Sequence, residues 1–403
     1  PQILIMNCKI TKKELTPVMS FGKMPVANGF LNKNDFEKEF FFEMSIGFSK
    51  ELSLLQLVDH PKPEMMFNAS YPFFTSSSKY MVNHFQDYSN WIISNYPDNN
   101  KKLIEIGSND GTFLSNFKNK NFETIGFEPS SNVSLIAQNK GLNSVNEFFN
   151  TETVKKFKNF LNQTDVICAA NVICHVPDLG NLFEAINLCL NKKGVFIFEE
   201  PYMGSMFSKV SYDQIYDEHI YMFSATSVNK ICKLYDLELI NVVKQDTHGG
   251  SLRYICAKKN EHQINSNVKK ILDLEKENNL DNLESCIKFK ENCEMSKLNL
   301  RKKLHDFKSQ GKKISGYAAT SKSTTILNYC DIGEDVIDYI CDTTKEKIGK
   351  YSPGKHIPIK PMEHFYKNLP DVAFLFAWNH KKEIFEKEKD FAKKGEWTAH
   401  VEI

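Results

Sequence analysis

The 403-residue sequence lacks paired cysteines, long apolar runs and any marked excess of charge. Its ten cysteines are scattered and none forms a C-x-x-C pair, which argues against a zinc ribbon and against a disulfide framework. No stretch approaches the roughly 18 apolar residues of a membrane span, and the start shows no basic segment followed by an apolar signal core. The formal net charge is +1, so a polyanionic partner is not favoured. We therefore expect a cytoplasmic protein with reduced thiols that binds neither nucleic acid nor membrane.

Length and pattern indicate several domains, because a chain of this size exceeds one ordinary core. Residues 1–75 carry short apolar runs broken by glycine and proline, which predicts a small, loop-rich α+β domain. In residues 76–260, short apolar runs alternate with segments of helical length, which predicts a parallel sheet covered on both faces. The runs that predict its strands are Leu103–Ile106, Thr124–Phe127, Val166–Ala169 and Val195–Phe198.

The later part of the chain predicts further elements. Residues 237–243 and 251–257 lie so close in sequence that they suit an antiparallel pair at the sheet edge. Residues 261–312 are rich in Lys, Glu and Asn with spaced apolar positions, which predicts one or two amphipathic linking helices with a solvated basic face. Residues 313–403 show a second, smaller α/β alternation, with strands expected at 313–317, 336–341 and 372–376 and a helix ending near Leu327.

The stretch from Glu105 to Gly111 predicts a ligand site. It follows a predicted strand and opens a predicted helix, so its glycines let a ligand approach the backbone. It is not the G-x-G-x-x-G fingerprint, which serves a pyrophosphate; S-adenosylmethionine has no pyrophosphate and needs carboxylates or amides for its amino group and ribose. Glu128 ends the second strand about 20 residues after Gly107, the spacing at which an acid accepts both ribose hydroxyls. The alternative is a sheet without a nucleotide whose turns merely need Gly and Asp.

We therefore predict a class I methyltransferase core of Rossmann-like α/β type that uses S-adenosylmethionine and releases S-adenosylhomocysteine. A further contribution is expected from the end of the strand near residue 170, because ligands sit at the carboxyl ends of such strands. His175 in that segment is equally well explained as an ordinary hydrogen-bonded loop histidine. The predicted donor-binding residues are Glu105, Gly107, Ser108, Asn109, Asp110, Gly111, Glu128, Pro129, Asn171 and His175.

Several long motifs occur in a fixed order along the chain. They are Met24–Phe30, Tyr212–His219 with Tyr221 and Phe223, Thr247–Arg253, Asn328–Cys330, Tyr351–Ile359 and Trp378–Asn379. Together with the donor stretch, they resemble the sugar C-methyltransferases of deoxysugar biosynthesis over most of the chain. The resemblance implies three domains: a zinc-binding amino-terminal domain, a methyltransferase core and a carboxyl-terminal Rossmann-like domain. It also implies methylation at C3 of a nucleotide-linked 4-keto sugar.

Two features depart from this family. Its members carry two C-x-x-C pairs in the first domain, but here Cys8 stands alone, and residues 45–57, where the second pair would fall, hold no cysteine. A single thiolate cannot provide the four ligands of structural zinc, so we predict no metal. We expect apolar packing to substitute, from Phe40, Phe41, Phe42, Leu54 and Leu57. The family's Tyr-His-Glu-His motif reads Tyr216-Asp217-Glu218-His219 in this chain.

Methylating a carbon needs a carbanion-like nucleophile, which forms next to a ketone whose oxygen takes the charge as an enolate. By resemblance, His219 is the base, and an ordinary imidazole is largely neutral at cytosolic pH, as proton abstraction demands. Glu218 or Tyr216 would orient the imidazole or hold the sugar, and the Tyr216 hydroxyl could stabilise the enolate oxygen. Tyr71 is the expected active-site tyrosine from the first domain. The alternatives are that residues 216–219 simply close a loop over the sheet and that Tyr71 belongs to core or lid packing.

The substrate side is predicted from the same resemblance. Arg253 would bind a phosphate of the nucleotide sugar through its two-pronged guanidinium, or else be the exposed arginine of a tight edge hairpin. Gly316–Ala319 has one glycine where a dinucleotide needs two or three, so NAD binding is not expected there. The predicted substrate-binding residues are Asp217, Tyr221, His248, Gly249, Arg253, Lys322 and Lys355.

Three functions remain open at this stage. The leading hypothesis is C-methylation of a nucleotide-activated 4-keto deoxysugar by a monomeric enzyme. O- or N-methylation of a related sugar would use the same donor site without needing a ketone. A catalytically silent homologue that binds donor or sugar is the third.

Overall fold

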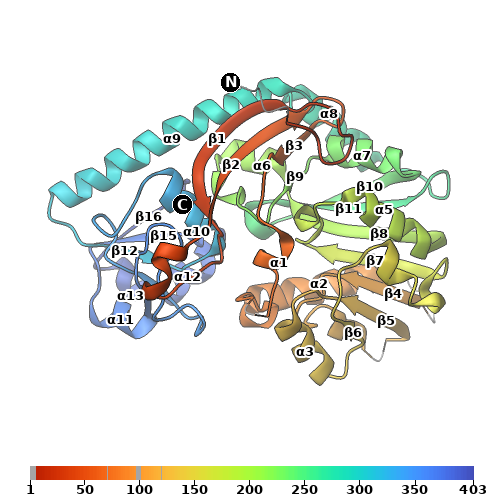
Figure 1. Cartoon of the computed structure of the whole chain (residues 1–403), viewed down its shortest axis with the longest axis horizontal. Helices are drawn as coiled ribbons and strands as arrows, with labels where there is room; N and C mark the ends of the chain where they lie inside the picture. Colours follow the sequence, from red (N-terminus) through yellow and green to blue (C-terminus); the bar gives the residue numbers. More distant parts are fainter. Residues whose placement is uncertain (1–5, 70, 97–100, 119) are drawn as a thin grey trace.

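The structure, a computed structural model, describes residues 6–69, 71–96, 101–118 and 120–403 (Figure 1). Residues 1–5 and 70 of the predicted first domain lie outside the described residues. So do residues 97–100 and 119 of the predicted second domain. Three sheets organise the chain, with four, seven and five strands. In Figure 1 the seven-stranded and five-stranded sheets lie side by side, and the strands of the first sheet arch over the space between them. The domain boundaries at 75, 260 and 312 stay a prediction.

The central sheet has the strand order β10-β11-β8-β7-β4-β5-β6. Its strands from β8 to β6 run parallel, whereas β11 runs antiparallel between β8 and β10, as the sequence predicted for this late pair. Every predicted apolar run forms a strand. The strands are β4 (Lys101–Ile106), β5 (Phe122–Phe127), β6 (Ser144–Val145), β7 (Thr164–Ala170), β8 (Leu190–Pro201), β10 (Leu237–Gln245) and β11 (Ser251–Lys258).

Helices cover both faces of the central sheet, because alternate strand residues point to opposite sides. Leu103 of β4 packs in a cluster with residues of α2, whereas Ile104 belongs to a cluster with residues of α5 and α7. The serines at the start of α7 explain its beginning, since Ser224 Oγ accepts from Ser227 N and Ser227 Oγ accepts from Ser224 N. The helices are α2 (Lys79–Asn95), α3 (Ser131–Asn139), α4 (Thr151–Val154), α5 (Leu179–Cys189), α6 (Met203–Lys209) and α7 (Ala225–Leu234).

The amino-terminal sheet is antiparallel, with the order β1-β2-β3-β9. Its strands are β1 (Thr16–Pro25), β2 (Phe41–Ser49), β3 (Leu54–Leu57) and β9 (Tyr221–Met222), and α1 (Pro63–Met66) follows β3. The expectation of a loop-rich region missed β1 and β2. Their pairing shifts register between Pro17 and Met19 and again between Ser20 and Lys23, where Gly22 takes a φ of +80°. These bulges bend the long ribbon seen in Figure 1.

The carboxyl-terminal sheet is parallel throughout, with the order β14-β13-β12-β15-β16. The strand expected at 336–341 begins only at Ile340, because Val336 and Ile337 donate backbone hydrogen bonds to Gly333 in a turn. Its elements are β12 (Ile314–Tyr317), α10 (Ser321–Tyr329), β13 (Ile340–Asp342), β14 (Ile359–Pro361), α11 (Met362–Lys367), β15 (Val372–Leu375), α12 (Lys381–Lys387), α13 (Lys389–Ala392) and β16 (Glu396–Thr398).

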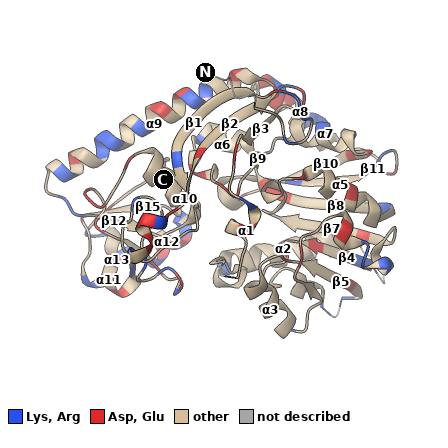
Figure 2. Cartoon of the chain, viewed as in Figure 1, with Lys and Arg blue, Asp and Glu red and all other residues tan. Residues whose placement is uncertain are grey.

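Two helices, α8 (Ser266–Glu277) and α9 (Leu283–Ser309), join the central and carboxyl-terminal sheets, in agreement with the predicted linker. Residues Phe289, Leu300 and Leu304 bury one side of α9, which lies over β1 in Figure 1. Figure 2 shows Lys, Arg, Asp and Glu interspersed along α9, which is the pattern of a solvated surface. Among the described residues, no helix combines the length and the hydropathy that a bilayer crossing needs.

Candidate active site

A cavity of about 820 Å³ lies where the three sheets meet, a volume within the range of small-molecule sites. All three parts of the chain line it. Asn28, Phe67 and Tyr71 come from the amino-terminal part, and Thr320, Lys322 and Lys347 from the carboxyl-terminal part. From the central part, the predicted residues that line it are Glu105, Gly107, Ser108, Asn109, Glu128, Pro129, Asn171, His175, Tyr216, Glu218, His219 and His248.

Gly107 turns the chain directly after β4. Its φ is +69°, and a Cβ atom there would lie 2.4 Å from Cγ2 of Val172. Only glycine tolerates both conditions without strain, since L residues with a side chain disfavour this conformation. The loop therefore keeps a bare stretch of backbone against the cavity, as the sequence predicted for the donor stretch.

Glu128 links the loop after β4 to the loop after β5. Its Oε2 accepts from the backbone N–H of Asn109 at 2.9 Å, and its Oε1 accepts from that of Ser130 at 2.8 Å. The Asn109 Oδ1 in turn accepts from the N–H and the hydroxyl of Thr75. Burial raises the pKa of Glu128, although both backbone bonds oppose that rise. A carboxylate can accept about four hydrogen bonds, so Glu128 retains capacity for a ligand.

Unpartnered polar atoms collect along this cavity. A buried polar group in a native protein is normally hydrogen-bonded, so such a cluster indicates a place for a polar ligand. Burial raises the pKa of Glu105 well above its ordinary value, and the nearby Glu128 adds to the effect. The atoms without a partner that belong to lining residues include Glu105 Oε2, Ser108 Oγ, Asn171 Oδ1, His175 Nε2 and His248 Nε2.

His219 lies in the segment that leads from a short 3-10 helix (Tyr212–Gln214) to β9. Its Nδ1 donates to the Gln214 carbonyl at 2.6 Å, which fixes the tautomer and leaves Nε2 with a lone pair. Burial lowers the pKa of His219 well below its ordinary value, and His175 and Lys322 lower it further. The imidazole is thus neutral at pH 7, the form that a general base needs.

Glu218 faces residues from the amino-terminal part of the chain. Its Oε1 accepts from Asn28 Nδ2 at 2.7 Å, and its Oε2 accepts from the Tyr71 hydroxyl at 3.3 Å. Burial raises the pKa of Glu218, and the neighbouring Asp217 raises it further. The structure thus brings Tyr71 to the segment Tyr216–His219. Asn28, which the sequence analysis did not single out, lies within the Met24–Phe30 motif that could have pointed to it.

Tyr216 packs beside the imidazole, with ring centroids 4.1 Å apart. Burial raises its pKa well above the ordinary value, and the nearby Glu218 acts in the same direction. The phenol is therefore a neutral hydroxyl at pH 7 that can donate a hydrogen bond.

The carboxyl-terminal part of the chain forms one wall of the cavity, here called the carboxyl-terminal wall. It carries Lys322, which the sequence predicted, and Lys347, which it did not. Burial lowers the pKa of both Lys322 and Lys347. Lys347 Nζ donates to the Ala319 carbonyl at 2.8 Å, and Ala319 N donates to Asp342 Oδ2 at 2.7 Å. The signal for Lys347 was weak, because it stands in a charged run, Thr344–Lys350, that reads as surface.

Helix α10 holds the motif Tyr212–His219 and the motif Met24–Phe30 together. The Thr324 hydroxyl donates to the Ala27 carbonyl at 2.9 Å, and the Thr325 hydroxyl donates to the Ile215 carbonyl at 2.7 Å. Asp213 adds a second link, because it accepts from Trp378 Nε1 at 2.7 Å and pairs with His400 at 3.0 Å. The sequence analysis missed this link, since the partners lie far apart in the chain.

Arg253 does not reach the cavity. Its guanidinium pairs with Glu199, with Nε at 2.7 Å from Oε1, and lies over the rings of Tyr88 and Trp91. The same Glu199 accepts from His84 at 2.6 Å, so the arginine is the centre of a buried network. This corrects the expected phosphate contact.

Other predicted residues also lie outside the lining. Lys355 pairs with Asp331 at the surface, and Tyr221 donates its hydroxyl to the Pro177 carbonyl. Asp217 accepts from the backbone N–H groups of Ala27 and Glu218, so it joins two segments instead of facing the cavity.

The other three predicted residues outside the lining, Asp110, Gly111 and Gly249, stabilise loops. Asp110 accepts from Ser76 N and from Thr112, and Gly111 has a φ of +77°. Gly249 packs under Trp378, where a Cβ would lie 2.1 Å from its ring.

The chain is similar to known methyltransferases. A family model described as “Methyltransferase domain” matches residues 83–242, and one described as “C-methyltransferase C-terminal domain” matches residues 246–401. The C-methyltransferase NovU of Streptomyces niveus is 26% identical over 381 residues, which cover 94% of this chain and 90% of that protein. The chain is thus similar to C-methyltransferases over most of its length. It is accordingly an S-adenosylmethionine-dependent methyltransferase, as the sequence motifs predicted.

Solved structures similar to this C-methyltransferase include two methyltransferases. One is an S-adenosylmethionine-dependent methyltransferase from Clostridium acetobutylicum, with 15% identity and a TM-score of 0.34, covering 46% of this chain and 94% of that chain. The other is the magnesium protoporphyrin IX methyltransferase from Synechocystis with bound SAM, with 10% identity and a TM-score of 0.33, covering 44% and 79%.

A third family model, described as “Putative zinc binding domain”, matches residues 8–67 of this C-methyltransferase. The donor set there does not suit zinc. Cys8 is the one cysteine among these residues, and its sulfur accepts from Gln56 Nε2 at 3.3 Å and from Thr11 N at 3.5 Å. Cys8 packs in one apolar cluster with Leu52 and Leu54. That this part folds without zinc stays our prediction, because one thiolate cannot replace four ligands.

The packing expected in place of zinc was only partly right. Phe42, Leu54 and Leu57 are buried, as predicted. Phe40 and Phe41 are each 42% exposed, so they do not fill the core. Cys8 and Leu54 share an apolar cluster with Leu15 and Leu52, whereas Phe42 and Leu57 belong to another cluster.

Proposed function

We propose that this C-methyltransferase methylates C3 of a nucleotide-linked 4-keto deoxysugar. The observation that carries the proposal is the bond from His219 Nδ1 to the Gln214 carbonyl, which leaves a neutral Nε2 beside the cavity. Carbon methylation requires such a base, because the carbon becomes a nucleophile only after it has lost its proton. The similarity to a protein named C-methyltransferase supports the same choice.

The reaction would begin with proton transfer. His219 Nε2 takes the C3 proton, and the electron pair of the C–H bond moves into the ring to give an enolate on the C4 oxygen. The Tyr216 hydroxyl, kept protonated by burial, would donate to that oxygen. Glu218, held by Asn28 and Tyr71 and kept protonated by its raised pKa, would fix the sugar in the same pocket.

The donor site fits S-adenosylmethionine. Gly107 offers bare backbone, Glu128 offers acceptors for ribose hydroxyls, and the free oxygens of Glu105 and Asn171 suit an amino group. When bound, adenosylmethionine supplies an electrophilic methyl group on a sulfonium, and the electron pair of the broken C–S bond stays on sulfur. The enolate carbon is the nucleophile, so this chain's residues need only hold the two reactants in line.

The nucleotide part would lie against the carboxyl-terminal wall. Two buried lysines, Lys322 and Lys347, face the cavity beside Thr320, whose side chain caps α10. Ammonium groups and a helix N-terminus both favour a diphosphate. The sugar would then reach the catalytic segment between this wall and the donor loop.

The test uses deuterium. The protein is incubated in heavy water with a panel of nucleotide-linked 4-keto sugars and labelled donor, and C3 exchange and product structure are followed by NMR. We expect exchange at C3 and a methyl group on that carbon, and we expect His219→Asn to lower both rates by about 100-fold or more. His262→Asn, a change at a half-buried histidine outside the cavity lining that contacts the Lys193 carbonyl, is the matched control. A product that keeps every ring proton would instead show O- or N-methylation and contradict the proposal.

A further inference from the structure

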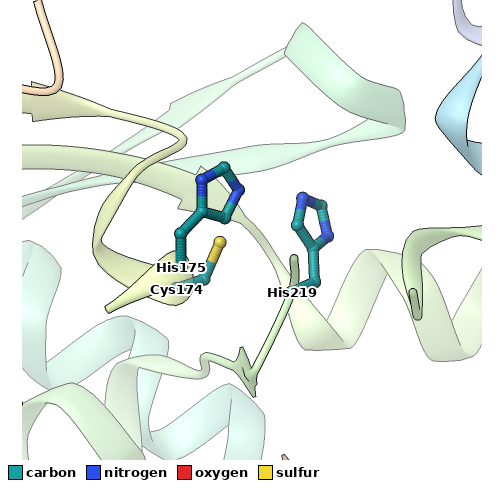
Figure 3. A group of neighbouring side chains, drawn as sticks. All are labelled: Cys174, His175 and His219. Carbon is teal, nitrogen blue, oxygen red and sulfur yellow. The ribbon is translucent and has the colours of Figure 1, made fainter. Parts of the chain in front are cut away.

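Cys174 and His175 end the loop after β7, directly opposite His219. Each residue offers one ligand atom, and the three atoms lie within 4.8 Å of one another. Figure 3 shows the two imidazole rings turned toward each other with the Cys174 sulfur beside them. The proposed reaction uses His219 and assigns no part to the thiol of Cys174, so the cluster needs a separate explanation.

The nitrogen lone pairs of the cluster are available to a ligand. His175 Nε2 is buried and has no hydrogen-bond partner. His219 donates Nδ1–H to a backbone carbonyl and keeps its Nε2 lone pair, which is the arrangement that metal-binding histidines show. The position of Cys174 is fixed, because its N–H and that of Val172 both donate to Glu200 Oε1.

The geometry suits a tetrahedral cation. Zinc bonds of about 2.0–2.3 Å place tetrahedral ligand atoms about 3.5 Å apart, so the cluster has to contract by about 1 Å. The rings of His175 and His219 stack with their centroids 5.3 Å apart and their planes 22° apart, so binding also requires the rings to turn their nitrogen edges toward a common point. His175 and His219 both line the cavity, which provides an entry path and room for water as the fourth ligand. One sulfur and two imidazole nitrogens select zinc over magnesium or calcium, which prefer oxygen.

We propose that Cys174, His175 and His219 form a binding site for Zn²⁺ and that its occupancy blocks the base. Binding forms one Zn–S and two Zn–N bonds and releases the thiol proton to solvent. The Nε2 lone pair of His219 then belongs to the metal and cannot take a proton from carbon. The block of catalysis rests on the proposed role of His219, whereas the metal site does not.

Binding is tested on the whole chain without any sugar. The protein is freed of metal with a chelator and titrated with CoCl₂, which reports a thiolate ligand by a charge-transfer absorption band, and with ZnCl₂ by calorimetry. We expect one site per chain that shows this band. Cys174→Ala should abolish the band, and His219→Asn should weaken binding by more than the roughly 10- to 100-fold that an outer-shell change costs.

Cys8→Ser is the matched control, because Cys8 is the cysteine of the region matched by the zinc-binding model. It should leave cobalt binding unchanged. Absence of binding, a band that survives Cys174→Ala, or a band lost in Cys8→Ser would each overturn the site.

The block of catalysis is tested by turnover in the presence of ZnCl₂. Each variant is compared with its own metal-free rate, so that a change in basal activity does not matter. Zn²⁺ should slow the wild type, a chelator should restore it, and Cys174→Ala should be insensitive. Binding to the wild type without slowing would overturn the block. If no sugar is turned over, the proposed function fails, while the titrations of Cys174→Ala and His219→Asn still decide whether the metal holds His219.

Discussion

The central and carboxyl-terminal sheets have similar loops after their first strands, but the side chains near these loops carry opposite charges. In the central sheet, Gly107 follows β4 with a φ of +69°, and Glu128 after β5 accepts from the loop at Asn109 N. In the carboxyl-terminal sheet, Ala318 follows β12 with a φ of +72°, and Asp342 at the end of β13 accepts from the loop at Ala319 N. Both sheets thus close their first loop with an acid from the second strand.

The side chains around these loops differ in charge. The central loop faces the buried carboxyl groups of Glu105 and Glu128, which suits the hydroxyl and amino donors of a nucleoside ligand. The carboxyl-terminal loop faces Lys322 and Lys347, which suits an anion. Under the proposed function, one backbone plan serves two ligands of opposite polarity, and the side chains around each loop decide which one.

The largest expected effect concerns Arg253, a cation of the central sheet that Glu199 neutralises. Arg253→Met should lower the free energy of unfolding by about 3–5 kcal/mol, because it leaves Glu199 buried without its partner. The KM for the nucleotide sugar should not change. Chemical denaturation and steady-state kinetics check the two halves, and a raised KM with unchanged stability would return Arg253 to the substrate site.

Removing the positive charge of the carboxyl-terminal wall should come next. Lys322→Met or Lys347→Met should each raise the KM for the nucleotide sugar about 10- to 100-fold, since a hydrogen bond to a charged group contributes about 1.5–3 kcal/mol. Affinity for adenosylmethionine, measured by calorimetry, should stay constant. Lys355→Met is the matched control, because Lys355 pairs with Asp331 away from the cavity. Equal loss of donor affinity would erase the contrast between the two sheets.

The two left-handed loop residues allow a direct swap. Gly107→Ala should cost about 1–3 kcal/mol of stability and weaken donor binding, because its Cβ would collide with Val172. Ala318→Gly should change stability by less than about 1 kcal/mol, since relief of strain and added chain entropy oppose each other. Thermal unfolding with and without donor measures both. A loss of stability in Ala318→Gly as large as that in Gly107→Ala would contradict this expectation, because it would show that the positive φ of Ala318 is not strained.

Asp217 offers the smallest and most specific test. Burial and the Asp217 charge both raise the pKa of Glu218, so the folded protein holds this proton more tightly than the unfolded chain. The stability from this proton is present at low pH and is lost as the pH rises through the folded pKa. In Asp217→Asn the Glu218 pKa falls, so the decline of kcat/KM with rising pH should begin at lower pH. An unchanged pH profile would show that Glu218 does not act in its neutral form.

The sequence by itself determined the mainly parallel central sheet with its antiparallel edge pair, the parallel carboxyl-terminal sheet and the glycine turn after β4. Buried runs such as Leu103–Ile106 and the glycine after them are local signals, because burial on both faces and a positive φ restrict residue type at each position. The motif at 216–219 predicted the catalytic segment through resemblance, and the structure places Tyr216, Glu218 and His219 at the cavity. Local sequence did not predict the long strands β1 and β2, whose bulges break the alternation that marks a strand.

Only the tertiary structure decided which polar residues share the cavity. Arg253 looked free to bind phosphate, yet its partner Glu199 stands in a different strand, and no local pattern predicts such a pair. Lys347 and Asn28 lie far from residues 216–219 in the chain. The packing of all three sheets brings them to the same cavity. Charged side chains carry no periodic signal of burial, because their place depends on partners that only the folded chain supplies.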